Sequence, residues 1–180
     1  MIDKSSVKLF PPERMMALDF ETYLIEPGIL APRVVCGSTA AYGVGDESSH
    51  LWAHMHDRVT ALSMARGVLD NGGLVWVGAN CAFDLGCLAA EDPDVLPMIF
   101  RAFKQGRVYD VLIAQALDAI AGGHLGIDPR TGGALKHPST GKQTNRYSLE
   151  VCVDLALGRL DAKANDQWRL RYALLDGVPV

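Results

Sequence analysis

The sequence lacks long apolar runs and is poor in cysteine. No stretch approaches the roughly 20 uninterrupted apolar residues of a membrane span, and the N-terminus, Met1–Ser6, has no apolar signal core. The four cysteines lie in apolar contexts without metal-ligand spacing: Cys36, Cys81, Cys87 and Cys152. We therefore expect a cytoplasmic protein with reduced, buried cysteines and no membrane partner.

The sequence also lacks an excess of positive charge. It carries 17 Lys and Arg against 21 Asp and Glu, a net charge of −4, which argues against a broad electrostatic surface for nucleic acid. An enzyme that meets nucleic acid in one local cleft stays open. The length of 180 residues and the 49% hydrophobic content suit one globular domain. We expect residues 1–14 to form an N-terminal arm and residues 15–180 to form the domain.

What the sequence does contain is a pair of carboxylates at the end of an apolar strand. Met15–Tyr23 reads MMALDFETY. In a strand, residues i and i+2 share a face, so Asp19 and Glu21 would lie side by side. Two adjacent carboxylates repel each other, and a divalent cation between them would make the arrangement favourable. An ordinary strand end that runs into an acidic turn is the alternative.

The order of the elements predicts an α/β fold, with a mixed sheet and helices on both of its faces. The central strands would be the first one and the apolar run 74–79. Further strands are expected at 33–42, 50–54 and 107–110. Helices are expected at 57–69, 93–104, 111–121, 148–157 and 166–175. The side chains expected to point inward from the helix at 57–69 are Val59, Leu62, Ala65, Val68 and Leu69. Those expected to point inward from the helix at 93–104 are Leu96, Ile99, Phe100 and Phe103.

A second acidic signal follows the run 74–79. Asn80–Asp84 reads NCAFD and leads into a helix, so Asp84 would lie in its first turn. If the strands before Asp19 and Asp84 are neighbours, three carboxylates converge at one edge of the sheet. Taken alone, Asp84 and Asp110 are each typical of a residue that caps or charges a helix start.

These segments together resemble the DEDD 3′–5′ exonucleases, which have an RNase H-like fold. Leu18–Thr22 resembles their first motif, and Asn80–Asp84 resembles their second. Val108–Asp110 and the helix opened by Ser148 resemble later segments. The nearest resemblance is to the proofreading exonuclease domain of phage family A DNA polymerases, and it covers nearly the whole chain from Met15.

The resemblance implies metal-dependent hydrolysis of phosphodiester bonds at DNA 3′ ends, with two Mg²⁺ or Mn²⁺ ions per site. It implies that Asp19 bridges both ions, that Glu21 binds one and helps to orient the water, and that Asp84 holds the second. Asn80, Phe20 and Thr22 would contact the substrate, although core burial is the alternative for Phe20. The implied partners are the 3′ end of single-stranded DNA and a polymerase domain in the parent protein, in the cytoplasm of a bacterium or a phage-infected host.

The third motif of that family is Tyr-x-x-x-Asp on a late helix. Tyr172 and Asp176 fit its spacing, but Gly177 and Pro179 would break the helix directly afterwards. We expect the true third motif to lie beyond Val180, so that this chain lacks a fourth carboxylate. The alternative function is then a catalytically weak or inactive nucleic-acid-binding module of the same fold.

A loop rich in glycine and in basic residues is expected over residues 122–145. It contains Arg130, Lys136 and Lys142, and Arg146 follows directly. Two interpretations stay open for this segment. It follows the phosphates of a single strand, or it is a solvated surface loop.

Overall fold

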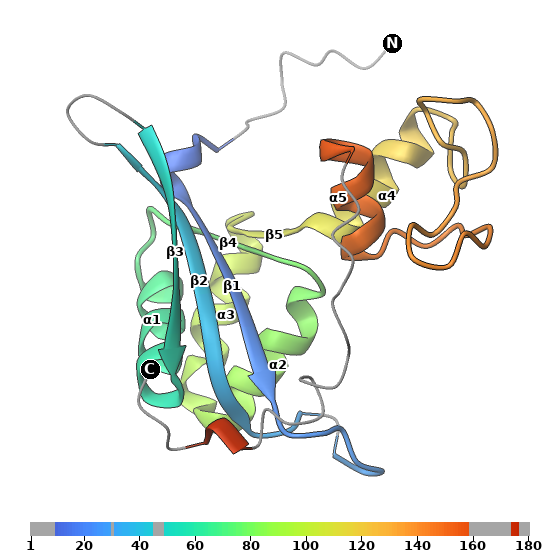
Figure 1. The fold of residues 1–180 in the computed structure, drawn as a ribbon. Helices are drawn as coiled ribbons and strands as arrows, with labels where there is room; N and C mark the ends of the chain where they lie inside the picture. Colours follow the sequence, from blue (N-terminus) through green and yellow to red (C-terminus); the bar gives the residue numbers. More distant parts are fainter. Residues whose placement is uncertain (1–9, 30, 45–48, 159–173, 177–180) are drawn as a thin grey trace.

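A five-stranded mixed sheet organises the chain (Figure 1). The computed structural model describes residues 10–29, 31–44, 49–158 and 174–176. The strand order is β3-β2-β1-β4-β5, in which β1 is parallel to β4, β4 is parallel to β5, and β2 is antiparallel to β1 and β3. The strands are β1 (Met15–Thr22), β2 (Val34–Val44), β3 (Ser49–Asp57), β4 (Val75–Gly78) and β5 (Val108–Asp110).

This sheet confirms the predicted α/β class and agrees with an RNase H-like fold. The prediction that the first strand and the run 74–79 lie centrally is also confirmed, because β1 and β4 pair through Met15–Ala17 and Val75–Val77. The third strand is longer than predicted. It runs along the whole of β2, from Ser49 opposite Val44 to Asp57 opposite Cys36.

Side-chain caps define where the helices begin. Asp57 accepts from the Thr60 amide at the start of α1, and Ser148 accepts from the Val151 amide at the start of α5. Gly158 ends α5 in the left-handed conformation that glycine favours, with φ of 62°. The helices are η2 (Pro12–Arg14), α1 (Arg58–Asp70), α2 (Cys81–Glu91), η3 (Pro93–Val95), α3 (Leu96–Lys104), α4 (Val111–Ala121) and α5 (Leu149–Leu157).

The main core lies between one face of the sheet and the helices α1, α2 and α3. Leu18 and Phe20 of β1 and Trp76 of β4 point into it, and the Phe20 and Trp76 rings meet edge to face at 6.2 Å between centroids. The helices α4 and α5 pack against each other beside β5, around a second small core (Figure 1). Its buried members are Ala119, Leu135, Tyr147 and Val151.

The buried Arg107 fastens β5 to the end of α1. Its guanidinium donates to the backbone carbonyls of the last helical turn and the following turn, at 3.0 to 3.4 Å. Carbonyls in the last turn of a helix lack a partner within the helix, so the one arginine satisfies the two that lie in this turn and also binds two carbonyls of the turn that follows. The acceptors are the carbonyls of Val68, Leu69, Asn71 and Leu74.

Two predicted apolar faces were wrong in part. In α3, Leu96, Phe100 and Phe103 are 41%, 69% and 51% exposed, whereas Ile99 is buried as predicted. Ala102 is fully buried on the inner face of α3, and the two aromatic side chains lie on the outer face. In α1, Val59 is 72% exposed and Ala61 takes the buried position instead. The expected helix over 166–175 falls mainly outside the described residues.

None of the helices in the described ranges is long and apolar enough to cross a membrane. The four cysteines are free thiols: Cys36, Cys81 and Cys87 are buried, and Cys152 is half-buried. This agrees with the expectation of reduced, buried cysteines.

A methyl group added to Gly37 tests how closely β2 packs on α1. A Cβ there would lie 3.0 Å from the Ala61 Cβ and 3.0 Å from the Phe20 ring. We expect Gly37→Ala to lower the free energy of unfolding by about 1–3 kcal/mol, measured by urea denaturation. The control is Gly86→Ala in α2, where no described atom lies within 4 Å and where alanine favours the helix. Equal stabilities for the two variants would contradict the packing.

Candidate functional site

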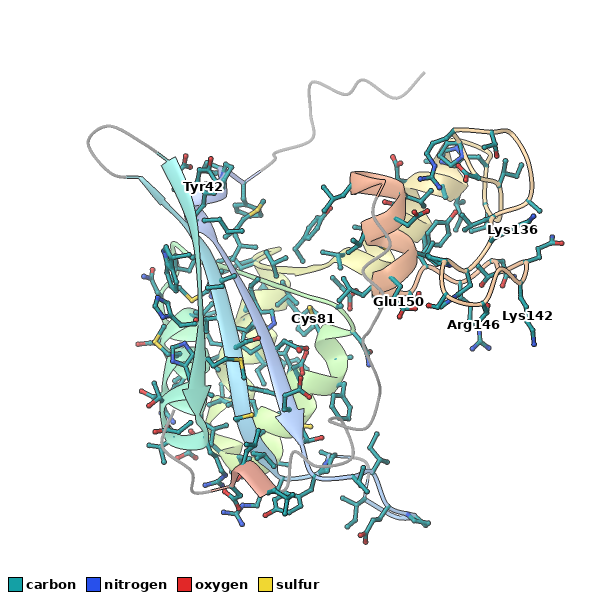
Figure 2. The ribbon with its side chains drawn as sticks, viewed as in Figure 1. Tyr42, Cys81, Lys136, Lys142, Arg146 and Glu150 are labelled. Atoms are coloured by element: carbon teal, nitrogen blue, oxygen red, sulfur yellow. The ribbon has the colours of Figure 1, made fainter. Side chains whose placement is uncertain are left out.

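Carboxylates gather where the parallel strands β1, β4 and β5 end. Asp19 and Glu21 lie near the end of β1, Asp110 is the last residue of β5, and Asp84 lies in the first turn of α2, directly after β4. The carboxyl ends of parallel strands are where α/β sheets bind ligands. Cys81, the first residue of α2, lies at this edge and is labelled in Figure 2.

Asp19 and Glu21 share the face of β1 opposite to the main core. Leu18 and Phe20 alternate with them and point into that core. Asp19 is exposed and Glu21 is half-buried. The predicted placement of the two acids side by side on one strand face is therefore confirmed by the register of β1.

Asp84 joins this pair through the backbone of β1. Because β4 pairs with β1 only as far as Ala17, the later part of β1 has no strand beside it on that edge. The Phe20 amide instead donates to Asp84 Oδ1 at 3.4 Å. A buried amide needs an acceptor, and α2 supplies one from its first turn.

The pKa of the Asp84 carboxyl is raised to about 7. Burial is the main cause, since only 2% of the residue is exposed. The negative charge of Asp19 raises the pKa further, as do those of Glu21 and Asp110, and the Phe20 amide opposes the shift. The three predicted metal ligands are therefore close enough to act on one another electrostatically.

Asp110 holds the starts of two helices together. Its Oδ1 accepts from the amides of Leu112 and Ile113, which caps α4 as predicted. Its Oδ2 accepts from the Cys81 amide at 2.8 Å, which caps α2. This second contact was not predicted from the sequence. It fixes the helix turn that carries Asp84. Asp110 is therefore a positioning residue for the acidic edge, the end of the sheet at which Asp19, Glu21 and Asp84 lie.

Asn80 forms the turn between β4 and α2. It adopts the left-handed conformation, with φ of 68°, which asparagine tolerates better than most residues. Its carbonyl accepts from the Phe83 amide at 2.9 Å, but its exposed side chain makes no cap bond to α2. The turn therefore depends on its backbone, and the amide group faces solvent at the acidic edge.

The two other predicted substrate contacts are engaged within the protein. Phe20 is only 5% exposed and packs on Trp76, so the core alternative is the one observed and its ring is not available for stacking on a base. The Thr22 hydroxyl donates to the carbonyl of Tyr23 at 2.9 Å and is half-buried.

Of the possible third motif, Tyr172 lies outside the described residues, whereas Asp176 is described. Its carboxylate accepts from the Tyr23 hydroxyl at 2.8 Å and lies 3.4 Å from the Arg33 guanidinium. The hydrogen bond from Tyr23 raises the pKa of that tyrosine. This three-residue contact beside the end of β1 carried no signal in the sequence.

The donor set suits a hard cation such as Mg²⁺ in its chemistry, because it consists of carboxylates. Across residues 10–29, 31–44, 49–158 and 174–176, however, no group of three or more His, Cys, Asp or Glu side chains is arranged to hold a metal ion. In the described residues, the acids thus lie at one edge of the sheet, but no three of them are arranged to bind one metal ion together.

No protein-family model and no curated protein matches the chain.

The raised pKa of Asp84 predicts a pH-dependent stability. Its pKa is near 4 in the unfolded chain and about 7 in the folded one. Protonated Asp84 therefore favours folding below about pH 4, and this contribution disappears as the pH rises towards 7. In the presence of EDTA, we expect Asp84→Asn to gain stability over the parent protein between pH 5 and 8, by about 4 kcal/mol at most.

The control is Asp118→Asn, which removes a carboxylate from an exposed position on α4. This control shows how much of the change comes from the loss of one negative charge away from the acidic edge. Parallel pH profiles for Asp84→Asn and the parent protein, measured by chemical denaturation, would show that Asp84 ionises normally.

Proposed function

We propose that the chain is a metal-dependent 3′–5′ exonuclease that hydrolyses phosphodiester bonds at DNA 3′ ends, as proofreading enzymes do. The observation that supports this most is the burial of Asp84 against β1 beside Asp19 and Glu21. Burying one carboxylate beside two others costs stability in the free protein. A bound cation would offset this cost, because its positive charge compensates the neighbouring carboxylates.

In this proposal Asp19, Glu21 and Asp84 hold the cations. Bound Mg²⁺ or Mn²⁺ would supply a Lewis acid that stabilises charge on the phosphate and a means of activating water. The DEDD resemblance supports the same three residues, and the mixed sheet agrees with the RNase H-like fold that the resemblance implies. A cation would also lower the pKa of Asp84, because it offsets the charges of Asp19 and Glu21.

In this proposal the other residues of the acidic edge contact the substrate or hold the metal-binding carboxylates in place. The Asn80 amide is exposed beside the start of α2, and in this proposal it donates a hydrogen bond to the terminal nucleotide. Asp110 keeps the first turn of α2 in register through the Cys81 amide. The Asp84 carboxylate stays beside β1 because the Phe20 amide holds it there.

A second candidate function is a nucleic-acid-binding module of the same fold without hydrolytic activity. Two observations favour it. Asp176, which fits the spacing of the third motif, is engaged by Tyr23 and Arg33. In addition, the described carboxylates do not form a group of three around one point.

Digestion of 5′-labelled single-stranded DNA separates the two functions. With Mn²⁺ or Mg²⁺, we expect a ladder that shortens from the 3′ end, and we expect Asp19→Asn to slow it by about a hundredfold or more. The matched control is Glu26→Gln, which neutralises an exposed carboxylate in the loop after β1 and should cut at the parent rate.

Three other outcomes are informative. A ladder that Asp19→Asn leaves unchanged would place the activity elsewhere. Release of the label as a mononucleotide, without a ladder, would show digestion from the 5′ end and would contradict the proposed polarity. Retained DNA binding without a ladder, in either metal, would favour the non-hydrolytic module.

A further inference from the structure

The segment between α4 and α5 folds into two small hairpins. The first pairs Ile127 with Ala134, and the second pairs Lys136 with Gln143. Leu135, between the two, is only 1% exposed and anchors them in the small core below α4 and α5. The glycine-rich segment is therefore a built surface whose side chains have defined positions.

Three acidic groups beside the hairpins are already paired within the segment that runs from Ile127 to the end of α5. Arg130 binds the carboxylates of Asp128 and Asp154 at 2.9 and 2.7 Å. His137 Nε2 lies 3.0 Å from the Glu150 carboxylate. These acids are therefore held by groups within the segment itself.

Three cations of the same segment remain exposed: Lys136, Lys142 and Arg146. Within the part of the chain that the structure describes, none of the three has an ion-pair partner. Figure 2 shows them projecting outward from the hairpins, on the side away from the sheet. A protein with a net charge of −4 thus carries a local excess of positive charge here.

A polar hollow lies between the two hairpins, with a volume of about 580 Å³. Gln143, Thr144 and Asn145 line one side of it, and the first hairpin lines the other with glycine and alanine and with the apolar Leu125 and Ile127. Lys142 and Arg146 directly flank the run from Gln143 to Asn145 in the sequence. The surface therefore combines hydrogen-bonding groups with unpaired cations.

We propose that this hairpin surface, defined by Lys136, Lys142 and Arg146, binds the phosphate backbone of a single-stranded nucleic acid. The proposal rests on the proposed function, since it describes how the substrate strand is held away from the acidic edge. Phosphates contacted by lysine and arginine release counterions. The polar hollow adds hydrogen-bond partners for the sugar and base groups of the same strand.

The test is the salt dependence of oligonucleotide binding, measured by fluorescence anisotropy in EDTA so that no hydrolysis occurs. The variant is Lys136→Gln with Lys142→Gln and Arg146→Gln. The control removes three cations from α1 and α3, as Arg66→Gln with Arg101→Gln and Lys104→Gln, and so changes the net charge equally. Oligo-dT and oligo-rU distinguish DNA from RNA as the source of the phosphates.

We expect the hairpin variant to bind at least about tenfold more weakly at low salt. The slope of log K against log salt should fall by about 2, since each phosphate contact on a single strand contributes about 0.7. The control variant should keep the parent slope. Equal losses in the two variants, or no loss in the hairpin variant, would overturn the proposal.

A second readout separates this proposal from the proposed function. Hydrolysis of a dinucleotide, which has a single phosphodiester bond, should be unchanged in the hairpin variant, whereas KM for a long oligonucleotide should rise. A protein without any hydrolytic activity would end the exonuclease proposal and leave the binding test intact. The circular dichroism spectrum of the hairpin variant should match that of the parent protein, so that a loss of binding reports the loss of the three cations.

Discussion

The contact between the Phe20 amide and the Asp84 carboxylate is the constraint on which the acidic edge depends. The strand β1 is longer than β4, so the second half of its edge needs an acceptor that no neighbouring strand provides. The first turn of α2 provides it. The same contact places a carboxylate at the level of Asp19 and Glu21 and removes it from water, which gives Asp84 a pKa of about 7.

The supporting contacts explain how this costly arrangement persists. Asp110 caps α4 and α2 together, so the end of β5 fixes the turn that carries Asp84. Arg107 ties the start of β5 to the end of α1. The contacts of Asp84, Asp110 and Arg107 thus link the ends of the strands to the helices beside them. The main core packs against the opposite face of β1.

Much of the fold was readable in the sequence because it depends on local patterns. The alternation around Asp19 and Glu21, the apolar run before Asn80 and the caps at Asp57, Asp110 and Ser148 are all short-range signals, and each appears in the structure.

Packing between elements was less readable. An apolar stripe predicts that one face of α3 is buried, but it does not predict that Ala102 takes the buried position while Phe100 and Phe103 face outward. Contacts between distant residues leave no pattern at all: the Asp84 bond to β1 and the Tyr23–Asp176–Arg33 contact join positions far apart in the chain. The sequence pattern predicted which acids form the site. The structure adds that Asp84 is buried and that its pKa depends on the charges of Asp19 and Glu21.

The most direct test of this account is the titration of the Asp84 carboxyl by carbon-13 NMR, without cations and with saturating Mg²⁺. We predict a pKa near 7 in the free protein and a fall towards the ordinary aspartate range with Mg²⁺, because a cation shared with Asp19 and Glu21 favours the charged form. A pKa that Mg²⁺ leaves unchanged would contradict the claim that these three carboxylates form one cation site.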